Sequence, residues 1–277
     1  MAKSDRERRR REERRLRDLE RAPRRPGESA LAHWLRVQKR SGVLRVGKEV
    51  RPAVNRILGR YSKIGDAPFF EPDRFDWVPA LEASWESIRK EAEFVLNARA
   101  SLPPLHEISP DHSRIDTGDD KWKVYFLKGY GYWVDEHCEQ CPETARAVRR
   151  IPGVESAFFS ILEAGKHIPK HRGPTRSIFT AHLGLMVPRE REKCWIKVDK
   201  TRAHWEPGRT LLFDDTYKHE VKNDTSEDRV VLLLHVRRPL RFPGSLVGSA
   251  VFSAIKWSPF VQDGLEKQRA WDERSRR

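Results

Sequence analysis

The sequence predicts a mainly β domain with flanking helices, built either as a sandwich or as a double-sheet jelly roll. Six short segments in the second half of the chain have the β-branched and aromatic residues typical of strands, namely 156–163, 177–187, 194–199, 209–214, 218–222 and 228–238. Turn residues separate them, at Gly165, Pro188, Glu206-Pro207-Gly208 and Asn223-Asp224. Many short strands at regular spacing are typical of these two all-β architectures.

Helical periodicity dominates the first half of the chain. Between 80 and 99, apolar residues recur three or four positions apart, which predicts an amphipathic helix. Residues 28–63 predict a helix in two pieces, and the second piece has basic residues opposite its apolar face. Such a helix either packs on its own domain or lies on an anionic bilayer. One further strand is expected from Trp122 to Tyr130.

Changes in composition divide the chain into four parts. Residues 1–27 are dominated by Arg and Glu and are expected to be a disordered or solvated helical tail. Residues 28–66 form a helical extension, 67–240 the main domain, and 241–277 a basic, aromatic C-terminal extension. This last part either packs on the domain or meets a lipid interface, because basic residues beside apolar ones suit both positions.

The charge is strongly basic, with 55 Lys and Arg against 41 Asp and Glu and a formal net charge of +14. The excess sits at the two ends, since the first 25 residues hold 12 basic and 6 acidic side chains. Such ends suit nucleic acid, an anionic membrane or simple solubility. We expect no nucleic-acid partner, and peripheral contact with an anionic membrane remains open.

Other features of the composition bear on the compartment. Three cysteines cannot build a disulfide scaffold, and Cys138-Glu139-Gln140-Cys141 is interpreted as the start of a helix because zinc needs about four ligands. The charged N-terminus does not look like a signal peptide, and no run of 18 apolar residues occurs. The expected compartment is the cytoplasm, with a peripheral position at the inner face of the membrane as the alternative.

Residues with metal-binding chemistry gather between Ser160 and Arg229. His171 and His219 lie 48 positions apart at strand edges, and Arg229 follows ten residues after the second histidine. Imidazole is a good ligand for Fe(II), and a guanidinium offers a planar fork to a carboxylate. The pattern therefore predicts a non-haem iron site beside a site for a 2-oxoacid.

Several motifs, in this order, resemble those of the aspartyl/asparaginyl β-hydroxylase family, a branch of the Fe(II)/2-oxoglutarate oxygenases. They are His171-Arg172-Gly173-Pro174-Thr175, His182-Leu183-Gly184-Leu185, the run from Phe213 to Glu220, and Arg229. The resemblance covers roughly residues 68–240. It implies a double-stranded β-helix, which is a cupin-like jelly roll, and a dioxygenase that uses Fe(II), 2-oxoglutarate and O₂ to hydroxylate an aliphatic C–H bond.

The resemblance also implies residue roles. His171 and His219 would be the iron ligands and the catalytic residues. His182 and Arg229 would contact the carboxylates of 2-oxoglutarate, with Arg229 on the distal one. Ser160 would support that same carboxylate, and Trp122 would line the pocket.

Two positions depart from the usual oxygenase pattern. The carboxylate expected two residues after the first histidine is replaced by Gly173, which has no ligand atom. We interpret Asp214 and Asp215 as residues that support the site or its turn. An arginine that the family often carries two residues before the position of His182 is replaced by Thr180, which weakens the case for an aspartate substrate. Arg172 and Arg176 could compensate from the loop.

These departures leave several functions open. The favoured reading is hydroxylation of a lipid acyl chain, as in the lineage that acts on lipid A or ornithine lipids. The main alternative is β-hydroxylation of aspartate or asparagine in a peptide or an amino acid. An inactive relative that binds a membrane or RNA, and a halogenase that uses the open iron position, are the remaining alternatives.

Overall fold

The computed structural model describes residues 29–98, 101–109 and 119–275, so the tail predicted for residues 1–27 lies outside it. Its strands form two antiparallel sheets. The large sheet contains β1 (Phe69–Phe70), β2 (Trp122–Gly129), β3 (Tyr132–Trp133), β4 (Val154–Leu162), β6 (Ile178–Met186), β9 (Thr210–Phe213) and β11 (Arg229–Arg237). The small sheet contains β5 (His167–His171), β7 (Cys194–Val198), β8 (Thr201–Ala203) and β10 (His219–Asn223).

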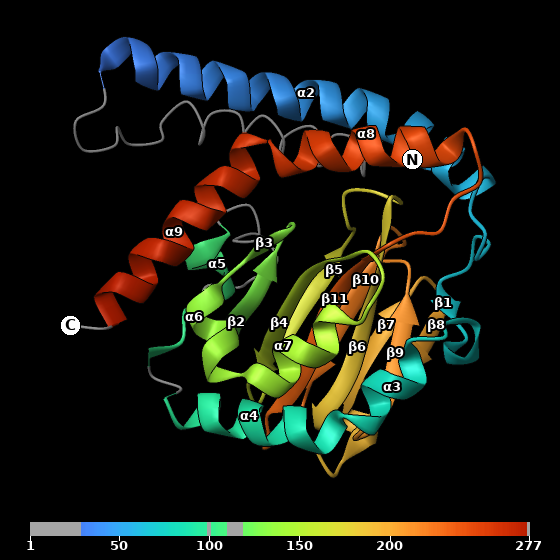
Figure 1. The fold of residues 1–277 in the computed structure, drawn as a ribbon, viewed down its shortest axis with the longest axis vertical. Coiled ribbons are helices and arrows are strands. Elements are labelled where there is room, and N and C mark those ends of the chain that lie inside the picture. The colour runs from blue at the N-terminus through green and yellow to red at the C-terminus, as the bar shows by residue number, and fades with distance from the viewer. Residues whose placement is uncertain (1–28, 99–100, 110–118, 276–277) are drawn as a thin grey trace.

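From β4 onward, the chain winds between the two sheets. The large sheet has the order β1-β9-β6-β11-β4-β2-β3, and the small sheet has the order β5-β10-β7-β8. The chain therefore runs from the large sheet to the small one and back three times before it ends in β11, between β4 and β6. This winding is that of a double-stranded β-helix, and it confirms the predicted fold class of a jelly roll with flanking helices (Figure 1).

The two-residue period of a strand divides the large sheet into two buried faces. On β11, Val230, Leu232 and Leu234 join the core under the helices, whereas Val231 and Leu233 join the core between the sheets. Ile168 of the small sheet belongs to the same inner core. Arg229 lies two residues before Val231 on the same strand, so the alternation of side chains directs it between the sheets as well.

Helices cover the outer face of the large sheet and one end of the barrel. The first group is α3 (Val78–Ala83), α4 (Trp85–Asn97) and α7 (Pro142–Arg149), which contribute to the core under the helices. The second group is α2 (Ala30–Arg60), α8 (Gly244–Lys256) and α9 (Pro259–Ser275), which pack on one another above the sheets (Figure 1). The short helices are α5 (Leu105–Ile108), α6 (Asp135–Gln140), η1 (Pro72–Arg74) and η4 (Arg191–Lys193).

The six predicted strands all occur, with ends that differ by at most two residues. The strands that the sequence did not predict are short, and one of them, β5, contains Pro169, which weakens the strand signal. Two helix predictions were wrong in detail. The helix expected over 80–99 is divided at Ser84 into α3 and α4, and α2 is one continuous helix although Pro52 lies inside it. Packing against α8 and α9 accompanies this continuity.

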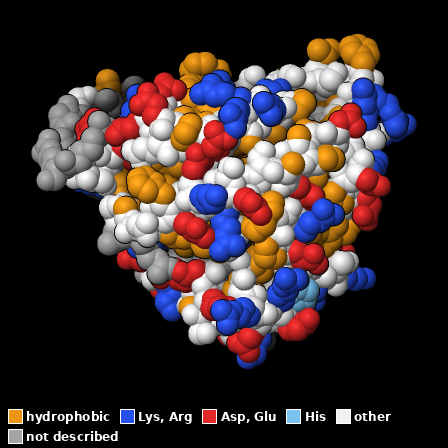
Figure 2. Space-filling view, turned by 60° about the horizontal axis from the view of Figure 1, so that its bottom comes forward, with side chains coloured by type: hydrophobic (Ala, Val, Ile, Leu, Met, Phe, Trp, Pro, Cys, Tyr) orange, Lys and Arg blue, Asp and Glu red, His pale blue; other side chains and the backbone are white. Residues whose placement is uncertain are grey.

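On the face shown in Figure 2, Lys and Arg side chains are interspersed with Asp and Glu, so neither charge dominates that face. None of the described helices has an apolar stretch long enough to cross a membrane.

Gly184 allows the corner between β8 and β9 to lie directly against β6. The Gly184 N–H donates to the Arg209 carbonyl at 3.1 Å, and its own carbonyl accepts from the Gly208 N–H at 2.8 Å. A Cβ at this position would collide with the backbone carbonyl of Glu206. Backbone cannot move aside as a flexible side chain can, so the position requires glycine.

We expect Gly184→Ala to lower the free energy of unfolding by about 1–3 kcal/mol, because overpacking displaces the corner. Urea denaturation measures the change. The matched control is Gly47→Ala in exposed α2, where nothing lies within 4 Å of the added Cβ. There the helix propensity of alanine should leave stability unchanged or raise it by up to about 1 kcal/mol. Equal losses in both variants would contradict the steric account.

Candidate active site

The two histidines of the predicted iron site lie side by side on adjacent strands of the small sheet. His171 ends β5 and His219 begins β10, and the two residues are direct register partners with ring centroids 3.9 Å apart. The register shifts between this pair and the next, Val221 with Ile168, so β5 has one extra residue around Pro169. A bulge of this kind changes the direction of a side chain, and here it brings the His171 ring beside its partner.

Each ring has its Nδ1 atom bonded to a backbone carbonyl two residues earlier in the chain. His171 Nδ1 lies 2.8 Å from the Pro169 oxygen, and His219 Nδ1 lies 3.0 Å from the Tyr217 oxygen. A carbonyl can only accept, so Nδ1 carries the proton in the neutral rings and Nε2 carries the lone pair. Burial lowers the pKa of His219, which favours this neutral form. Two neutral imidazoles with fixed tautomers suit a divalent metal ion.

The position left open by Gly173 is filled by another carboxylate. A Cβ built on Gly173 would fall on the side chain of Asp215, and the Gly173 N–H donates to the Asp215 carbonyl at 2.7 Å. Within the described ranges, no group of three or more His, Cys, Asp or Glu side chains is placed to hold a metal ion. Asp215 therefore packs beside the histidine pair without completing a three-residue ligand set.

Asp215 is buried, and its Oδ1 atom has no hydrogen-bond partner among the described residues. Burial, and then the nearby Asp214 carboxylate, raise the pKa of Asp215 to about 7. This carboxyl group can therefore hold or release a proton near neutral pH, one loop away from the histidines. The interpretation of Asp215 as a supporting residue stays a prediction. Gly173 has no side chain, and the Asp215 carboxyl group occupies the space where one would lie.

Arg229 is a buried cation with no ion pair within the part of the chain that the structure describes. Its guanidinium lies 4.8 Å from the Trp205 ring centroid, and its Nη1 donates to the Ser160 carbonyl at 3.5 Å. Its Nε atom has no partner in the described chain. Burial lowers the pKa of Arg229 to about 10, and the group still carries its charge at neutral pH. A buried, unpaired guanidinium favours an anionic ligand.

His182 offers a second donor next to this cation. Trp205 Nε1 donates to His182 Nδ1 at 3.2 Å, so in the neutral ring the proton is on Nε2. The Nε2 atom is buried and finds no partner among the described residues. Burial, and then the positive charge of Arg229, hold the pKa of His182 well below its usual value. Trp205 thus orients a neutral N–H donor that a carboxylate could accept from.

The remaining predicted residues lie beside these two. Trp122 Nε1 donates to Ser160 Oγ at 3.1 Å, and both side chains are buried. Phe213 connects this group to the iron side, since its ring centroid lies 5.0 Å from that of His182 and 5.9 Å from that of His219. The structure therefore brings all six predicted site residues to the space between the sheets, as a histidine pair and an adjacent group around the buried Arg229.

Two supporting features were not predicted from the sequence. Trp205 lies in the loop before β9 and has no local signal, because its role comes from contacts with two other strands. The second is a buried ion pair, in which Arg238 Nη2 lies 2.6 Å from Asp214 Oδ2. Asp214 also accepts from the Thr216 N–H at 2.9 Å, which fixes the turn that leads to His219.

The loop arginines do not take the place of the missing arginine at Thr180. Arg176 pairs with Asp66 at 2.6 Å and with Asp214 at 3.5 Å, and Arg172 donates to the Thr216 carbonyl at 2.8 Å. Both guanidinium groups are therefore engaged within the protein. Thr180 faces the space between the sheets, buried and uncharged.

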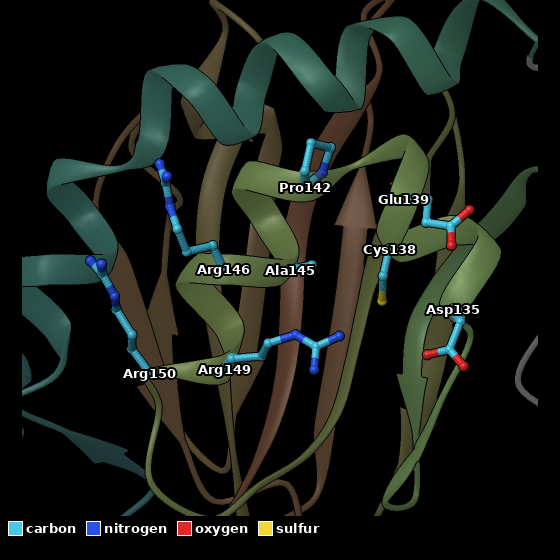
Figure 3. A pocket seen from close by; sticks show the side chains of 8 residues that line it. All are labelled: Asp135, Cys138, Glu139, Pro142, Ala145, Arg146, Arg149 and Arg150. Carbon is cyan, nitrogen blue, oxygen red and sulfur yellow. The ribbon is translucent and has the colours of Figure 1, made fainter.

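The C-x-x-C segment lies away from this site, on the outer side of the large sheet. Cys138 lines a shallow hollow formed by α6 and α7, and Arg149 extends toward it (Figure 3). Burial raises the pKa of the Cys138 thiol and raises that of Cys141 to about 12. Both thiols stay protonated at neutral pH, which agrees with a structural role. Cys141 is the N-cap of α7, as predicted, whereas Cys138 lies inside α6.

Comparison with known proteins gives one family match and several relatives. The family model described as Aspartyl/Asparaginyl beta-hydroxylase matches residues 82–239. An ornithine lipid ester-linked acyl 2-hydroxylase of Rhizobium tropici is 39% identical over 215 residues, which cover 78% of this chain and 76% of that protein. The human aspartyl/asparaginyl beta-hydroxylase is 30% identical over 167 residues, 58% of this chain but 21% of its own length.

A solved oxidoreductase of the 2OG-Fe(II) oxygenase family, from Burkholderia pseudomallei, is 14% identical. It covers 43% of this chain and 69% of its own, with a TM-score of 0.33. The fold assignment therefore rests on the order of the strands in the two sheets and not on this superposition.

We expect the ligand-free protein to lose stability as the pH falls from 7 toward 5. A histidine whose folded pKa is depressed binds a proton more readily in the unfolded chain. Its contribution to stability is therefore present above the unfolded pKa of about 6.5 and is lost progressively as the pH falls from there toward the folded pKa. His182→Gln removes one such group and keeps a side-chain N–H donor. Its unfolding free energy should fall less steeply, by up to about 1.4 kcal/mol per pH unit. Parallel pH profiles for both proteins would contradict the assignment of a buried neutral His182.

Proposed function

This chain belongs to the aspartyl/asparaginyl beta-hydroxylase family, and we propose that it is an Fe(II)- and 2-oxoglutarate-dependent hydroxylase of a lipid acyl chain, of the ornithine-lipid type. The observation that carries the proposal is the buried, unpaired Arg229 beside the N–H donor of His182, next to a pair of neutral imidazoles. These groups together fit a dianionic keto acid bound beside a divalent metal ion.

The residues suit the iron ion and the 2-oxoglutarate molecule in different ways. The Nε2 atoms of His171 and His219 would hold the iron, because their Nδ1 atoms are engaged with carbonyls. Arg229 would bind the distal carboxylate, and the Trp122–Ser160 pair lies against the same region. When bound, iron with 2-oxoglutarate and O₂ supplies the oxidising power for C–H hydroxylation.

The chain's own contribution is position, charge and protection from water. Trp205 holds His182 in the tautomer that presents Nε2–H and covers the guanidinium of Arg229. The inner core excludes water around both groups, which strengthens each charge-assisted hydrogen bond. Asp215 can hold a proton beside the histidine pair at neutral pH.

Two observations support a lipid substrate. The rhizobial relative, an ornithine lipid ester-linked acyl 2-hydroxylase, aligns over 78% of this chain and 76% of its own, whereas the human relative aligns over 21% of its own length. Thr180 is buried and uncharged, and Arg176 is committed to two carboxylates, so neither offers a cation to an aspartate side chain. An aliphatic substrate requires no such cation.

We expect Arg229→Met to raise the KM for 2-oxoglutarate about 10- to 100-fold, because a charge-assisted, two-pronged contact is lost. The same change should leave the ligand-free protein as stable or more stable, since an unpaired buried charge is removed. Succinate formation and thermal unfolding with and without 2-oxoglutarate measure the two effects. The control is Arg202→Met, whose guanidinium lies on the surface over Trp195. An unchanged KM in Arg229→Met would contradict the assigned carboxylate contact.

We expect His171→Ala to abolish iron-dependent succinate formation while the protein remains folded, because one of only two protein ligands is removed. Iron content after anaerobic loading gives an independent measurement. Wild-type protein that neither takes up iron nor forms succinate with any substrate would instead identify a binding protein that has lost catalysis.

The substrate class follows from one further measurement. Mass spectrometry of membrane lipids, with the gene present and absent, should reveal one added oxygen on an acyl chain. Incubation with aspartate- and asparagine-containing peptides is the comparison, and an added oxygen on a peptide alone would replace the lipid assignment with peptide β-hydroxylation.

A further inference from the structure

α8 carries an apolar stripe on the side that faces away from the protein. Phe242 lies two residues before the helix, Leu246 lies within it, and Trp257 is its C-cap; these side chains are 76%, 62% and 68% exposed. Ala250 and Ala254 continue the stripe between them and are exposed as well. Single exposed apolar residues are common, but three large ones on and beside one helix point to a partner.

The opposite side of α8 is already used by the fold. A Cβ on Gly244 would meet Tyr61 of the segment after α2, and a Cβ on Gly248 would meet Leu240 and Leu58. Phe252 is buried on this side. α8 therefore packs one side on the protein, and its exposed side carries the apolar residues together with the small Ser249 and Ser253. An exposed apolar stripe of this kind suits contact with a second apolar or interfacial phase.

The surroundings of the stripe are cationic. Arg241 and Lys256 stand at its two ends, and the sequence has no acidic residue from Arg229 to Gln262. The adjoining end of α2, which packs on α8, adds the exposed Arg56 and Arg60. An aromatic and aliphatic stripe between basic residues matches the apolar and anionic layers of a lipid surface.

This surface lies at the end of the barrel where the loop after His171 leads into β6. On β11, Arg229 is at the first position and His235 lies near the end, paired in register with Thr180. α8 follows β11 directly, so it lies at the Thr180 end, away from Arg229. Gly248 approaches Ser177, the residue before β6, with its added Cβ 3.9 Å from the serine Cβ.

The loop that follows His171 is attached to the same helices. The Arg176 N–H donates to Asn55 Oδ1 of α2 at 3.0 Å, and the Arg238 N–H donates to the Ser177 carbonyl at 2.9 Å. α2, α8 and the loop of the histidine site therefore lie at the same end of the molecule (Figure 1).

We propose that the α8 surface, defined by Phe242, Leu246 and Trp257 with Arg241, Lys256 and the adjoining end of α2, docks the protein on an anionic lipid bilayer. Docking places the Thr180 end of the barrel against the membrane, where an acyl chain can enter. The role in catalysis rests on the proposed function, whereas the binding of lipid does not.

Vesicle co-sedimentation tests the surface directly. The full chain is mixed with phosphatidylcholine vesicles that either contain or lack a minority of phosphatidylglycerol. We expect binding to the anionic vesicles that weakens as salt rises. Leu246→Glu and Trp257→Glu should each weaken it about ten-fold or more, because an apolar anchor is lost and a negative charge is added.

The matched control is Phe94→Glu on α4, at the far end of the molecule, where the phenylalanine is 61% exposed. This variant should bind vesicles like the wild type. Equal weakening by Phe94→Glu and Leu246→Glu, or no weakening by either change on α8, would overturn the proposal. So would wild-type binding that is the same with and without phosphatidylglycerol, or self-association that depends on Leu246 without any binding to vesicles.

A second assay separates this proposal from the proposed function. The candidate acyl lipid is offered either in anionic vesicles or dispersed in detergent, and hydroxylation is followed by mass spectrometry. Leu246→Glu should lose turnover in vesicles and keep it in detergent, because the histidine site itself is unchanged. Loss in both forms would contradict a docking role. A wild type that binds vesicles but hydroxylates lipid in neither form would refute the function and leave the docking surface in place.

Discussion

The cross-strand pairing of His171 with His219 is the constraint on which the rest of the site depends. The two residues are 48 positions apart, and only the antiparallel register of β5 and β10 makes them neighbours. A shift of that register by one residue would turn one ring to the other face of the sheet. The bulge at Pro169 and the two backbone carbonyls then fix how the rings face and which nitrogen carries the lone pair.

Beside this pair, the protein keeps polar groups that its own fold does not satisfy. Arg229 has no counter-ion and His182 Nε2 no acceptor in the described chain, although both are buried. Each such group costs free energy, up to several kcal/mol for a charge. Two cores on either side of the large sheet offset that cost. An anionic ligand would recover it on binding, so the unsatisfied groups act as a preformed site.

The helices have two structural roles, one on the outer face of the large sheet and one at an end of the barrel. α3, α4 and α7 cover the outer face of the large sheet, so that both of its faces are buried. α2 and α8, from opposite ends of the sequence, close one end, and Asn55 of α2 accepts a hydrogen bond from the loop after His171. That end also presents the exposed stripe of α8, which links access to the site with contact to a lipid surface.

The sequence alone predicted the fold class, the strand that begins at Trp122 and the six strands between 156 and 238, and it singled out the candidate site residues. Strand periodicity and turn residues are properties of short segments of sequence. The residue types of the two histidines and Arg229 indicate the chemistry that they could perform. Tertiary structure decided what depends on distant contacts. Trp205 has no local signal, Asp215 matters because Gly173 leaves space for it, and α2 continues through Pro52 beside α8 and α9. Position in space follows from packing between segments far apart in the chain, and no short stretch of sequence contains that information.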